Sequence, residues 1–327
     1  MKAVAHTGRD IASLVDIELP KPAPGPRDLL VKVEAVSVNP VDTKQRKTDV
    51  AAPRVLGWDA AGTVAAVGAQ VTLFKPGDAV YYAGDVTRPG CDSELHLVDE
   101  RIVGRKPKSL DFAHAAAVPL TAITAWESYF DRMKVASGKS LLIINGAGGV
   151  GSIGIQIARL AGLKVIATAS RQETIAWVKE LGAEQVVDHS KPLRPQLEAL
   201  GLKHVDYIAN FSGELDAHWP AMADLVAPQG AVLAIVSNSN PLAMDLVRSK
   251  SATVCWELMF TRPRFQTPDM IEQHKLLNQV AERLDAGKLR STLRETLSPI
   301  NAANLRKAHE RLESGRMIGK LVLQRWA

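Results

Sequence analysis

Residues 140–151 read Ser-Leu-Leu-Ile-Ile-Asn-Gly-Ala-Gly-Gly-Val-Gly. The apolar run at 141–144 predicts a buried strand, and the stretch from Ser152 to Leu160 predicts a helix. Between them, Gly146, Gly148 and Gly151 have the spacing G-x-G-x-x-G. The segment therefore predicts a strand, a tight glycine turn and a helix in direct succession.

The residues that follow repeat this alternation of strand and helix. Further strand candidates, separated by helical stretches, lie at 164–169, 185–187, 207–210 and 231–236. Alternation of this kind is typical of a parallel sheet that helices cover on both faces. We predict a doubly wound Rossmann domain over residues 122–264.

The flanking segments predict a second, β-rich domain. Apolar runs at 29–38, 63–67 and 79–82 are separated by proline and glycine. After Pro263 the sequence predicts helices over 267–286 and 302–313 and a closing strand over 319–324 that joins the sheet of the first segment. The expected fold class is thus α/β, with residues 1–121 and 265–327 forming one domain.

Composition limits the classes of protein to which the chain can belong. The formal net charge is +5, but lysine and arginine are scattered, which argues against a nucleic-acid partner. There are only two cysteines, Cys91 and Cys255, without a CxxC spacing, so a reducing, cytoplasmic location is expected. No uncharged apolar stretch is long enough to predict a membrane span.

The glycine turn is the expected cofactor site. Its backbone and the start of the following helix can bind a pyrophosphate through Gly146, Gly148, Gly149, Val150 and Gly151.

The end of the next strand predicts which dinucleotide is preferred. About twenty residues after the turn, where a site for NAD would have an acidic residue, the chain has Thr168-Ala169-Ser170-Arg171. Because Arg171 can pair with a 2′-phosphate and Ser170 can donate to it, we predict NADPH rather than NADH.

Several motifs along nearly the whole chain resemble the medium-chain dehydrogenase/reductase superfamily, in particular its quinone oxidoreductase branch and the proteins called zinc-type alcohol dehydrogenase-like. Several of these motifs are loose by themselves, but their order and spacing together are specific. They are residues 38–44 (VNPVDTK), 56–64 (LGWDAAGTV), 74–80 (FKPGDAV), 119–122 (PLTA), 146–151, 169–171, 181–183 (LGA) and 319–322 (GKLV).

The resemblance implies an architecture and further site residues. It implies a GroES-like β domain that binds substrate, a Rossmann domain that binds the cofactor, and a homodimer. It also implies that Thr124 lies beside the nicotinamide and that Phe211 and Val236 end strands that line the cofactor.

The resemblance also bears on zinc. Zinc-containing members have Cys and a His-Glu pair where this chain has Asn39 and Trp58-Asp59. A catalytic zinc needs about three strong ligands. We therefore predict that no metal is bound. The histidines give no H-x-x-x-H pair, and His96, His114 and His189 are expected to be surface or core residues.

Without a metal, the expected substrates are quinones and α,β-unsaturated carbonyls, which are electron-poor enough to accept hydride with hydrogen-bond help alone. The predicted catalytic donors are Asn39, Tyr82 and Thr124. The predicted substrate pocket contains Asp42, Trp58, Tyr81 and Trp256, although the segment 255–260 that includes Trp256 could instead form a dimer interface.

Two alternative functions stay open at this point. One is a zinc-dependent alcohol dehydrogenase with atypical ligands. The other is an NADPH-sensing or RNA-binding protein with little turnover.

Overall fold

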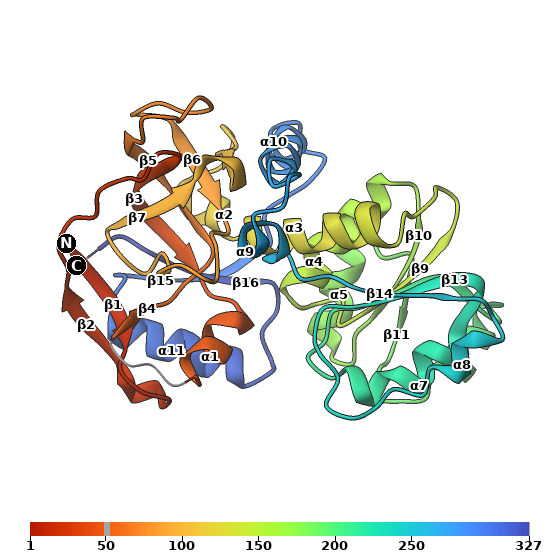
Figure 1. Ribbon diagram of the computed structural model, residues 1–327. Coiled ribbons are helices and arrows are strands. Elements are labelled where there is room, and N and C mark those ends of the chain that lie inside the picture. Colours follow the sequence, from red (N-terminus) through yellow and green to blue (C-terminus); the bar gives the residue numbers. More distant parts are fainter. Residues whose placement is uncertain (49–52, 327) are drawn as a thin grey trace. The chain divides into compact units, whose positions relative to one another are not determined.

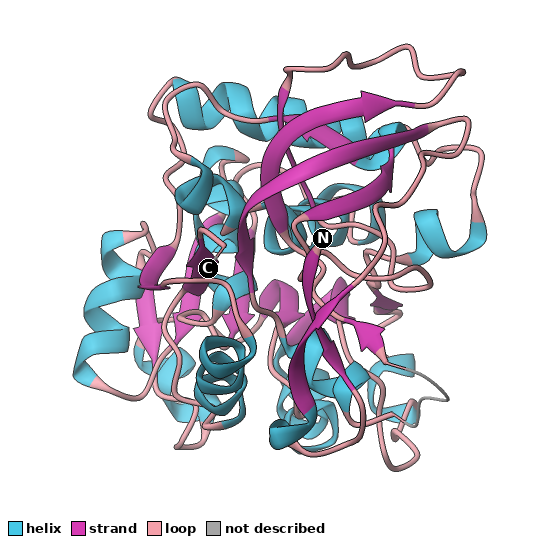
Figure 2. Ribbon diagram, turned by 90° about the vertical axis from the view of Figure 1, so that its left-hand side faces the viewer, coloured by secondary structure: helices cyan, strands magenta, loops and turns pink. Residues whose placement is uncertain are grey.

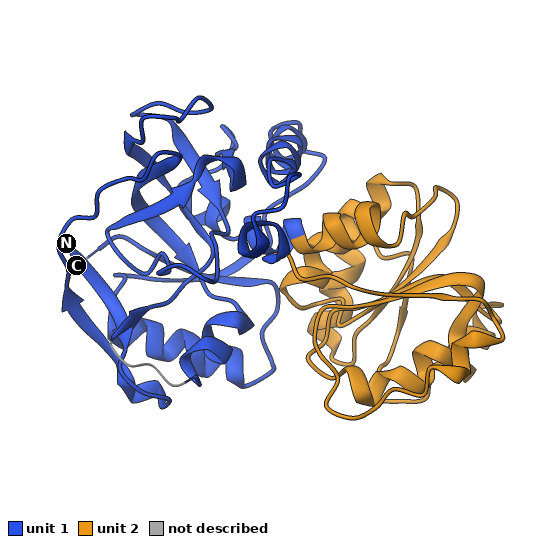
Figure 3. Ribbon diagram, in the orientation of Figure 1, with its two compact units in different colours: residues 1–123, 260–327 blue, residues 124–259 orange. Residues whose placement is uncertain are grey.

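The computed structural model describes residues 1–48 and 53–326. The chain divides into two compact units, coloured separately in Figure 3. Unit 1 comprises Met1–Ile123 and Phe260–Ala327, and unit 2 comprises Thr124–Met259. Unit 1 is therefore built from two chain segments that are far apart in the sequence, whereas unit 2 is continuous.

Unit 1 is rich in strands (Figures 1 and 2). Its strands are β1 (Lys2–His6), β2 (Leu14–Glu18), β3 (Asp28–Ser37), β4 (Arg54–Val55), β5 (Ala60–Val67), β6 (Ala79–Tyr82), β7 (Leu95–Asp99), β8 (Val103–Arg105), β15 (Leu293–Leu297) and β16 (Lys320–Gln324). Its helices and 3₁₀ turns are η1 (Ile11–Ser13), α1 (Pro40–Arg46), η2 (Glu100–Ile102), α2 (Phe112–Ala116), α9 (Thr261–Phe265), α10 (Glu272–Asp285) and α11 (Ala302–Glu313). Helix α3 (Pro119–Trp126) crosses from unit 1 into unit 2.

Strand β3 organises the larger sheet of unit 1, whose order is β15-β16-β3-β5-β6-β8, with β7 also paired to β3. The closing strand β16 runs antiparallel to β3, with Val322 opposite Ser37 and Gln324 opposite Ala35. This pairing confirms the prediction that the last strand joins the sheet of the N-terminal segment.

Unit 2 contains a parallel sheet whose order is β11-β10-β9-β12-β13-β14. Its strands are β9 (Ser140–Ile144), β10 (Lys164–Thr168), β11 (Gln185–Val187), β12 (Val205–Asn210), β13 (Val226–Ala234) and β14 (Thr253–Trp256). Its helical segments are the π-helical turn η3 (Glu127–Arg132), α4 (Gly149–Leu160), α5 (Gln172–Glu180), α6 (Leu193–Ala199), α7 (Leu215–Leu225) and α8 (Asp245–Arg248). The strand order reverses between β9 and β12, and this is where open parallel sheets bind their ligands.

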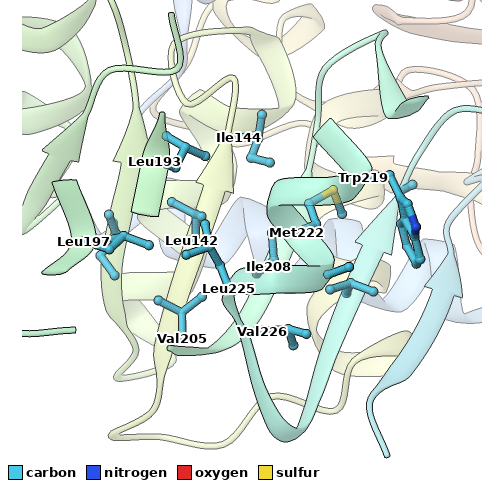
Figure 4. Packing of buried hydrophobic residues seen from close by; sticks show 14 of the residues in the cluster. Leu142, Ile144, Leu193, Leu197, Val205, Ile208, Trp219, Met222, Leu225 and Val226 are labelled. Carbon is cyan, nitrogen blue, oxygen red and sulfur yellow. The ribbon is translucent and has the colours of Figure 1, made fainter. Parts of the chain in front are cut away.

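Side chains that alternate along β9 pack on opposite faces of this sheet. Leu142 and Ile144 join a buried cluster with α6 and α7, to which Leu197 and Trp219 contribute (Figure 4). On the other face, Leu141 and Ile143 are also fully buried. Full burial of such a side chain contributes roughly 1.5–3 kcal/mol, which explains why the strand is apolar on both faces.

Several elements differ from the sequence prediction; for example, α4 begins at Gly149 rather than at Ser152, and β13 begins at Val226 rather than at residue 231. The helix expected from Thr267 begins at Glu272, because Thr267 precedes a proline and the side chain of Asp269 accepts a hydrogen bond from Arg262 at 3.0 Å. Strand β14 was not predicted, since its four residues include a cysteine and a tryptophan and show no clear alternation. Among the described residues, no helix is long and apolar enough to cross a membrane.

A buried imidazole links α11 to the rest of unit 1. His309 is completely buried, and neither of its ring nitrogens has a hydrogen-bond partner among the described residues. Burial and, to a smaller extent, the nearby cation of Arg46 lower the pKa of His309 to about 4, against the opposing charge of Glu313. His309 is therefore neutral in the folded protein at pH 7.

This pKa predicts a loss of stability in acid. A histidine has a pKa near 6.5 in an unfolded chain, so the unfolded state binds the proton first and the contribution of His309, present above pH 6.5, disappears as the pH falls towards 4. We expect the unfolding free energy of the wild type to fall by about 3 kcal/mol more across this range than that of His309→Leu. Urea unfolding at several pH values measures the difference.

The matched control is His114→Leu, because His114 is exposed on α2 and bonded to Asp111. It should change the pH dependence by no more than about 1 kcal/mol, because an exposed ion pair such as that with Asp111 contributes little to stability. Parallel curves for the wild type and His309→Leu would show that His309 does not titrate as described.

Candidate functional site

The glycine turn after β9 has a backbone that side chains would obstruct. Asn145 has a positive φ of 63°, which asparagine tolerates better than most residues. A Cβ atom on Gly148 would lie 2.7 Å from Asn145 Nδ2, and one on Gly151 would lie 2.3 Å from the Asn145 carbonyl oxygen. A Cβ on Gly146 would lie 2.8 Å from Cβ of Ala167 on β10. Close approaches thus require glycine at Gly146 and Gly151, and a side chain at Gly148 would displace the amide group of Asn145.

The turn presents the start of α4. Gly148 is the N-cap residue, and no side chain of the described residues caps this end. The first N–H groups of a helix carry partial positive charge and bind phosphate groups well. Gly149, Val150 and Gly151, which are predicted to belong to a pyrophosphate cradle, form the first turn of α4, so the helix begins three residues before the expected start at Ser152.

Hydrogen bonds fix this turn at the point where the strand order reverses. Asn145 Nδ2 donates to the carbonyl oxygen of Phe211 at 3.1 Å, which connects the residues just after β9 and β12. On the other side, the Asn145 and Gly146 amides donate to the Thr168 hydroxyl at 3.0 Å and to its carbonyl at 3.1 Å. The cradle is therefore tied to the ends of both neighbouring strands.

Arg171 lies at the end of β10, just before α5. Its guanidinium group pairs with Glu173 at 3.0 Å, and both side chains reach solvent. Ser170 beside it is exposed. A cation and a hydroxyl thus follow β10, as the sequence predicted, but Glu173, which sequence reasoning missed, competes for the cation.

His189 is a second residue that sequence reasoning did not place at this site. It follows β11, and its Nδ1 lies 3.1 Å from the hydroxyl of Thr168. It therefore lies at the same edge of the sheet as the glycine turn and the residues after β10. The available signal was its position directly after a predicted strand of a parallel sheet, where ligand-binding residues concentrate.

The other predicted residues of unit 2 also lie near strand or helix ends. Phe211 is buried after β12, Val236 is half-buried after β13, and Thr124 is buried on α3. Trp256 ends β14 and is 44% exposed.

Unit 1 holds a buried polar network around Asn39. Asn39 Nδ2 donates to the carbonyl of Ser37 at 3.2 Å and to Asp59 Oδ2 at 3.1 Å. The ammonium group of Lys320 donates to Asn39 Oδ1 and, at 2.9 Å, to the carbonyl of Val38. It also pairs with Asp59 Oδ2 at 3.1 Å. The amide of Asn39 is thus fully engaged, and sequence reasoning missed Lys320.

Two carboxyl groups of this region bind protons more tightly than usual. Burial raises the pKa of Asp59 to about 6, and the charge of Lys320 opposes the shift. Burial also raises the pKa of Asp42 to about 7, against the hydrogen bond from the backbone N–H of Asn39. Asp42 Oδ1 has no hydrogen-bond partner among the described residues.

The aromatic residues predicted for the pocket point to different partners. Tyr81 Oη donates to the carbonyl of Leu277 on α10 at 2.6 Å, and the indole N–H of Trp58 donates to the carbonyl of Asp85 at 3.0 Å. Both side chains are buried.

Tyr82 forms a pair with His96. Burial lowers the pKa of His96 to about 4, so the ring is neutral at pH 7. Its Nε2 lies 3.1 Å from the carbonyl of Pro89 and must carry the hydrogen. Nδ1 therefore accepts from Tyr82 Oη at 3.0 Å.

The chain matches two family models. Residues 25–108 match the alcohol dehydrogenase GroES-like domain, and residues 181–323 match the zinc-binding dehydrogenase domain.

Similar proteins cover nearly the whole chain. A zinc-type alcohol dehydrogenase-like protein of Staphylococcus aureus is 45% identical over 93% of this chain and 92% of its own length. The 2-methylene-furan-3-one reductase of Solanum lycopersicum is 31% identical over 99% of this chain and 79% of its own length. A quinone oxidoreductase of Pseudomonas aeruginosa is 30% identical over 92% of both chains.

Solved structures share the fold. A Rhizobium etli protein, provisionally described as a zinc-dependent alcohol dehydrogenase, has a TM-score of 0.96 and 53% identity over 100% of this chain and 98% of its own. A mycobacterial protein complexed with NADPH has a TM-score of 0.87 and 25% identity over 99% of this chain and 100% of its own. These matches confirm the predicted combination of a GroES-like and a Rossmann domain, and the chain belongs to the medium-chain dehydrogenase/reductase superfamily of oxidoreductases.

Proposed function

We propose that the protein is an NADPH-dependent oxidoreductase that transfers hydride to a quinone or an α,β-unsaturated carbonyl without zinc. The observation that carries the cofactor proposal is the cation of Arg171, which follows β10 and immediately precedes α5. The names of the tomato and Pseudomonas relatives support the substrate class.

The residues of unit 2 fit a dinucleotide. The glycines leave space that a Cβ would fill, and the uncapped start of α4 can bind a pyrophosphate. Arg171 and Ser170 would bind the 2′-phosphate, and Thr124, Phe211 and Val236 would lie along the nicotinamide end. The NADPH bound to the mycobacterial neighbour supports this choice of cofactor.

A bound nicotinamide supplies the hydride, so the chain has to orient the acceptor and stabilise its developing negative charge. Asn39, Tyr82 and Thr124 are the proposed donors. For Asn39 this role requires an N–H to leave Ser37 or Asp59, and for Tyr82 it requires the hydroxyl to turn from His96. Asp42, Trp58 and Tyr81 are the proposed pocket residues, whereas Trp256, which the sequence left open between the pocket and an interface, is proposed for the interface because it is 44% exposed.

The test is oxidation of NADPH by protein dialysed against a chelator, with quinones, enones and simple aldehydes as acceptors. We expect turnover of quinones or enones without added metal, because these acceptors need no Lewis acid. Activity confined to aldehydes and restored only by zinc would support an alcohol dehydrogenase with atypical ligands instead. Binding of NADPH without turnover of any acceptor would favour a sensing protein.

Arg171→Ala tests the cofactor preference. Loss of a charge-assisted pair with the 2′-phosphate should weaken NADPH binding roughly 10- to 100-fold and change NADH binding less than about two-fold. Glu173→Gln should act in the opposite direction, tightening NADPH by up to about five-fold, because it removes a weak competing ion pair. Fluorescence titration of each cofactor measures both effects.

The matched control is Arg194→Ala, which removes another arginine of unit 2 that is bound to Asp224. It should leave both affinities unchanged. Equal losses for NADPH and NADH in Arg171→Ala would exclude contact with a 2′-phosphate.

We also propose a cytoplasmic homodimer. Its location rests on the free thiols of Cys91 and Cys255. For the interface, β14 is the edge strand of the parallel sheet, and beside it Trp256 and Leu258 are 44% and 46% exposed. An open strand edge flanked by apolar side chains can pair with the same strand of a second copy.

Trp256→Glu tests this interface. We expect the wild type to have the mass of a dimer in light scattering and the variant to shift towards the monomer, because the charge would be buried against a second copy. A monomeric wild type, or a variant that dimerises equally well, would exclude β14 as the interface. Glu184→Gln, an exposed change elsewhere in unit 2, serves as the control.

A further inference from the structure

The family description names zinc, but the residues at the corresponding positions do not fit a metal. The indole nitrogen of Trp58 is only a donor and is bonded to Asp85. The oxygen atoms of Asn39 and Asp59 that could bind a cation already contact the ammonium group of Lys320. Among residues 1–48 and 53–326, no three His, Cys, Asp or Glu side chains gather as a ligand set.

We propose that the ammonium group of Lys320 takes the place of the metal. Asn39 and Asp59 stand at positions that correspond to zinc ligands, and the side-chain cation of Lys320 binds both of them. This inference does not depend on the identity of the cofactor or of the redox substrate.

The contacts of Lys320 use its full donor capacity. An ammonium group has three N–H donors. The three oxygen atoms around it are the Val38 carbonyl, Asn39 Oδ1 and Asp59 Oδ2. The Lys320 residue is 3% exposed and Asp59 is completely buried. No donor is left for a substrate oxygen, so the cation is a positioning group.

The backbone delivers this side chain to the network. Gly319 has a positive φ of 59°, and a Cβ there would lie 2.3 Å from the carbonyl of Thr292. The Lys320 amide donates to the same carbonyl at 2.9 Å. The start of β16 is therefore held firmly where its lysine enters the interior of unit 1.

Through its three oxygen partners, Lys320 connects separate parts of unit 1. Val38 and Asn39 lie between β3 and α1, and Asp59 directly precedes β5. Asp59 Oδ1 in turn accepts from the backbone N–H of Leu120 on α3 at 3.1 Å. One cation thus fixes three segments, as a structural metal would, but offers no open coordination position.

The first experiment compares the melting temperatures of Lys320→Met, Asp59→Asn and the double variant. Removing one partner of a buried ion pair leaves the other charge unpaired. We expect Lys320→Met to melt roughly 5–10 °C below the wild type at a pH of about 8. The double variant should melt closer to the wild type than Lys320→Met does, because it buries no unpaired charge.

The pH dependence separates an ion pair from simple packing. The raised pKa of Asp59 means that its carboxyl group is protonated below a pH of about 6, where it needs no counterion. The difference in melting temperature between the wild type and Lys320→Met should therefore be smaller at a pH of about 5 than at a pH of about 8. If Lys320→Met melts below the wild type by the same amount at both pH values, and the double variant melts as low, then Lys320 contributes only packing and the proposal is overturned.

Zinc content gives a second measurement, which does not require any variant to fold. Wild-type protein is incubated with Zn²⁺ alone, dialysed and analysed for metal. We expect less than about 0.1 zinc per chain and no rise in melting temperature with Zn²⁺. About one tightly held zinc per chain would show that a metal can displace the ammonium group and would overturn the proposal. NADPH affinity, measured in each variant, should be unchanged because the glycine turn lies in unit 2.

Discussion

The close approach of α4 to the turn after β9 is the constraint on which unit 2 depends. The backbone of residues 145–151 folds so tightly that Cβ atoms on its motif glycines would collide with Asn145 or with β10. This approach aims the start of α4 along the edge of the sheet, where the residues after β10, β11 and β12 also lie. The side chain of Asn145 then ties the turn to Phe211 across the reversal in strand order. The proposed phosphate-binding surface is therefore formed by the backbone of this turn and of the first turn of α4, with the Asn145 side chain holding the turn in place.

Unit 1 is organised by buried charge in addition to apolar packing. Asn39, Asp59 and Lys320 satisfy one another in an interior that would otherwise exclude each of them. Because every hydrogen-bond group of the Asn39 side chain has a partner within unit 1, this side chain stabilises the unit itself. It could contact a substrate only by giving up one of these hydrogen bonds. The family's zinc-type name therefore says little about the chemistry of this network. Of the three positions that correspond to zinc ligands, one is Trp58, and the other two, Asn39 and Asp59, bind the ammonium group of Lys320.

Regular elements could be predicted from the sequence, whereas long-range polar partners could not. The bounds of β6, β11 and α11 agree with those expected from local patterns, because short apolar runs and helical periodicity are local properties. The glycine turn and Arg171 could be placed for the same reason. Lys320 was missed, although a single lysine between Gly319 and an apolar strand was a usable signal. Its partner Asn39 is 281 residues away, and no local pattern reports such a pairing.

The position of β16 also sets the order in which the two units can fold during synthesis. Unit 2 is continuous from Thr124 to Met259, so the ribosome has made all of its strands before β16 is translated. The larger sheet of unit 1 needs β16 between β3 and β15, and its buried carboxyl group Asp59 has no ammonium partner until Lys320 arrives. Before β16 is made, β3 can already pair with β5 and β7, but its last residues, Ala35, Val36 and Ser37, have no partner strand on the β16 side. Unit 1 therefore completes its larger sheet only after all strands of unit 2 have been made, and an unpaired strand end of this kind is exposed to aggregation until then.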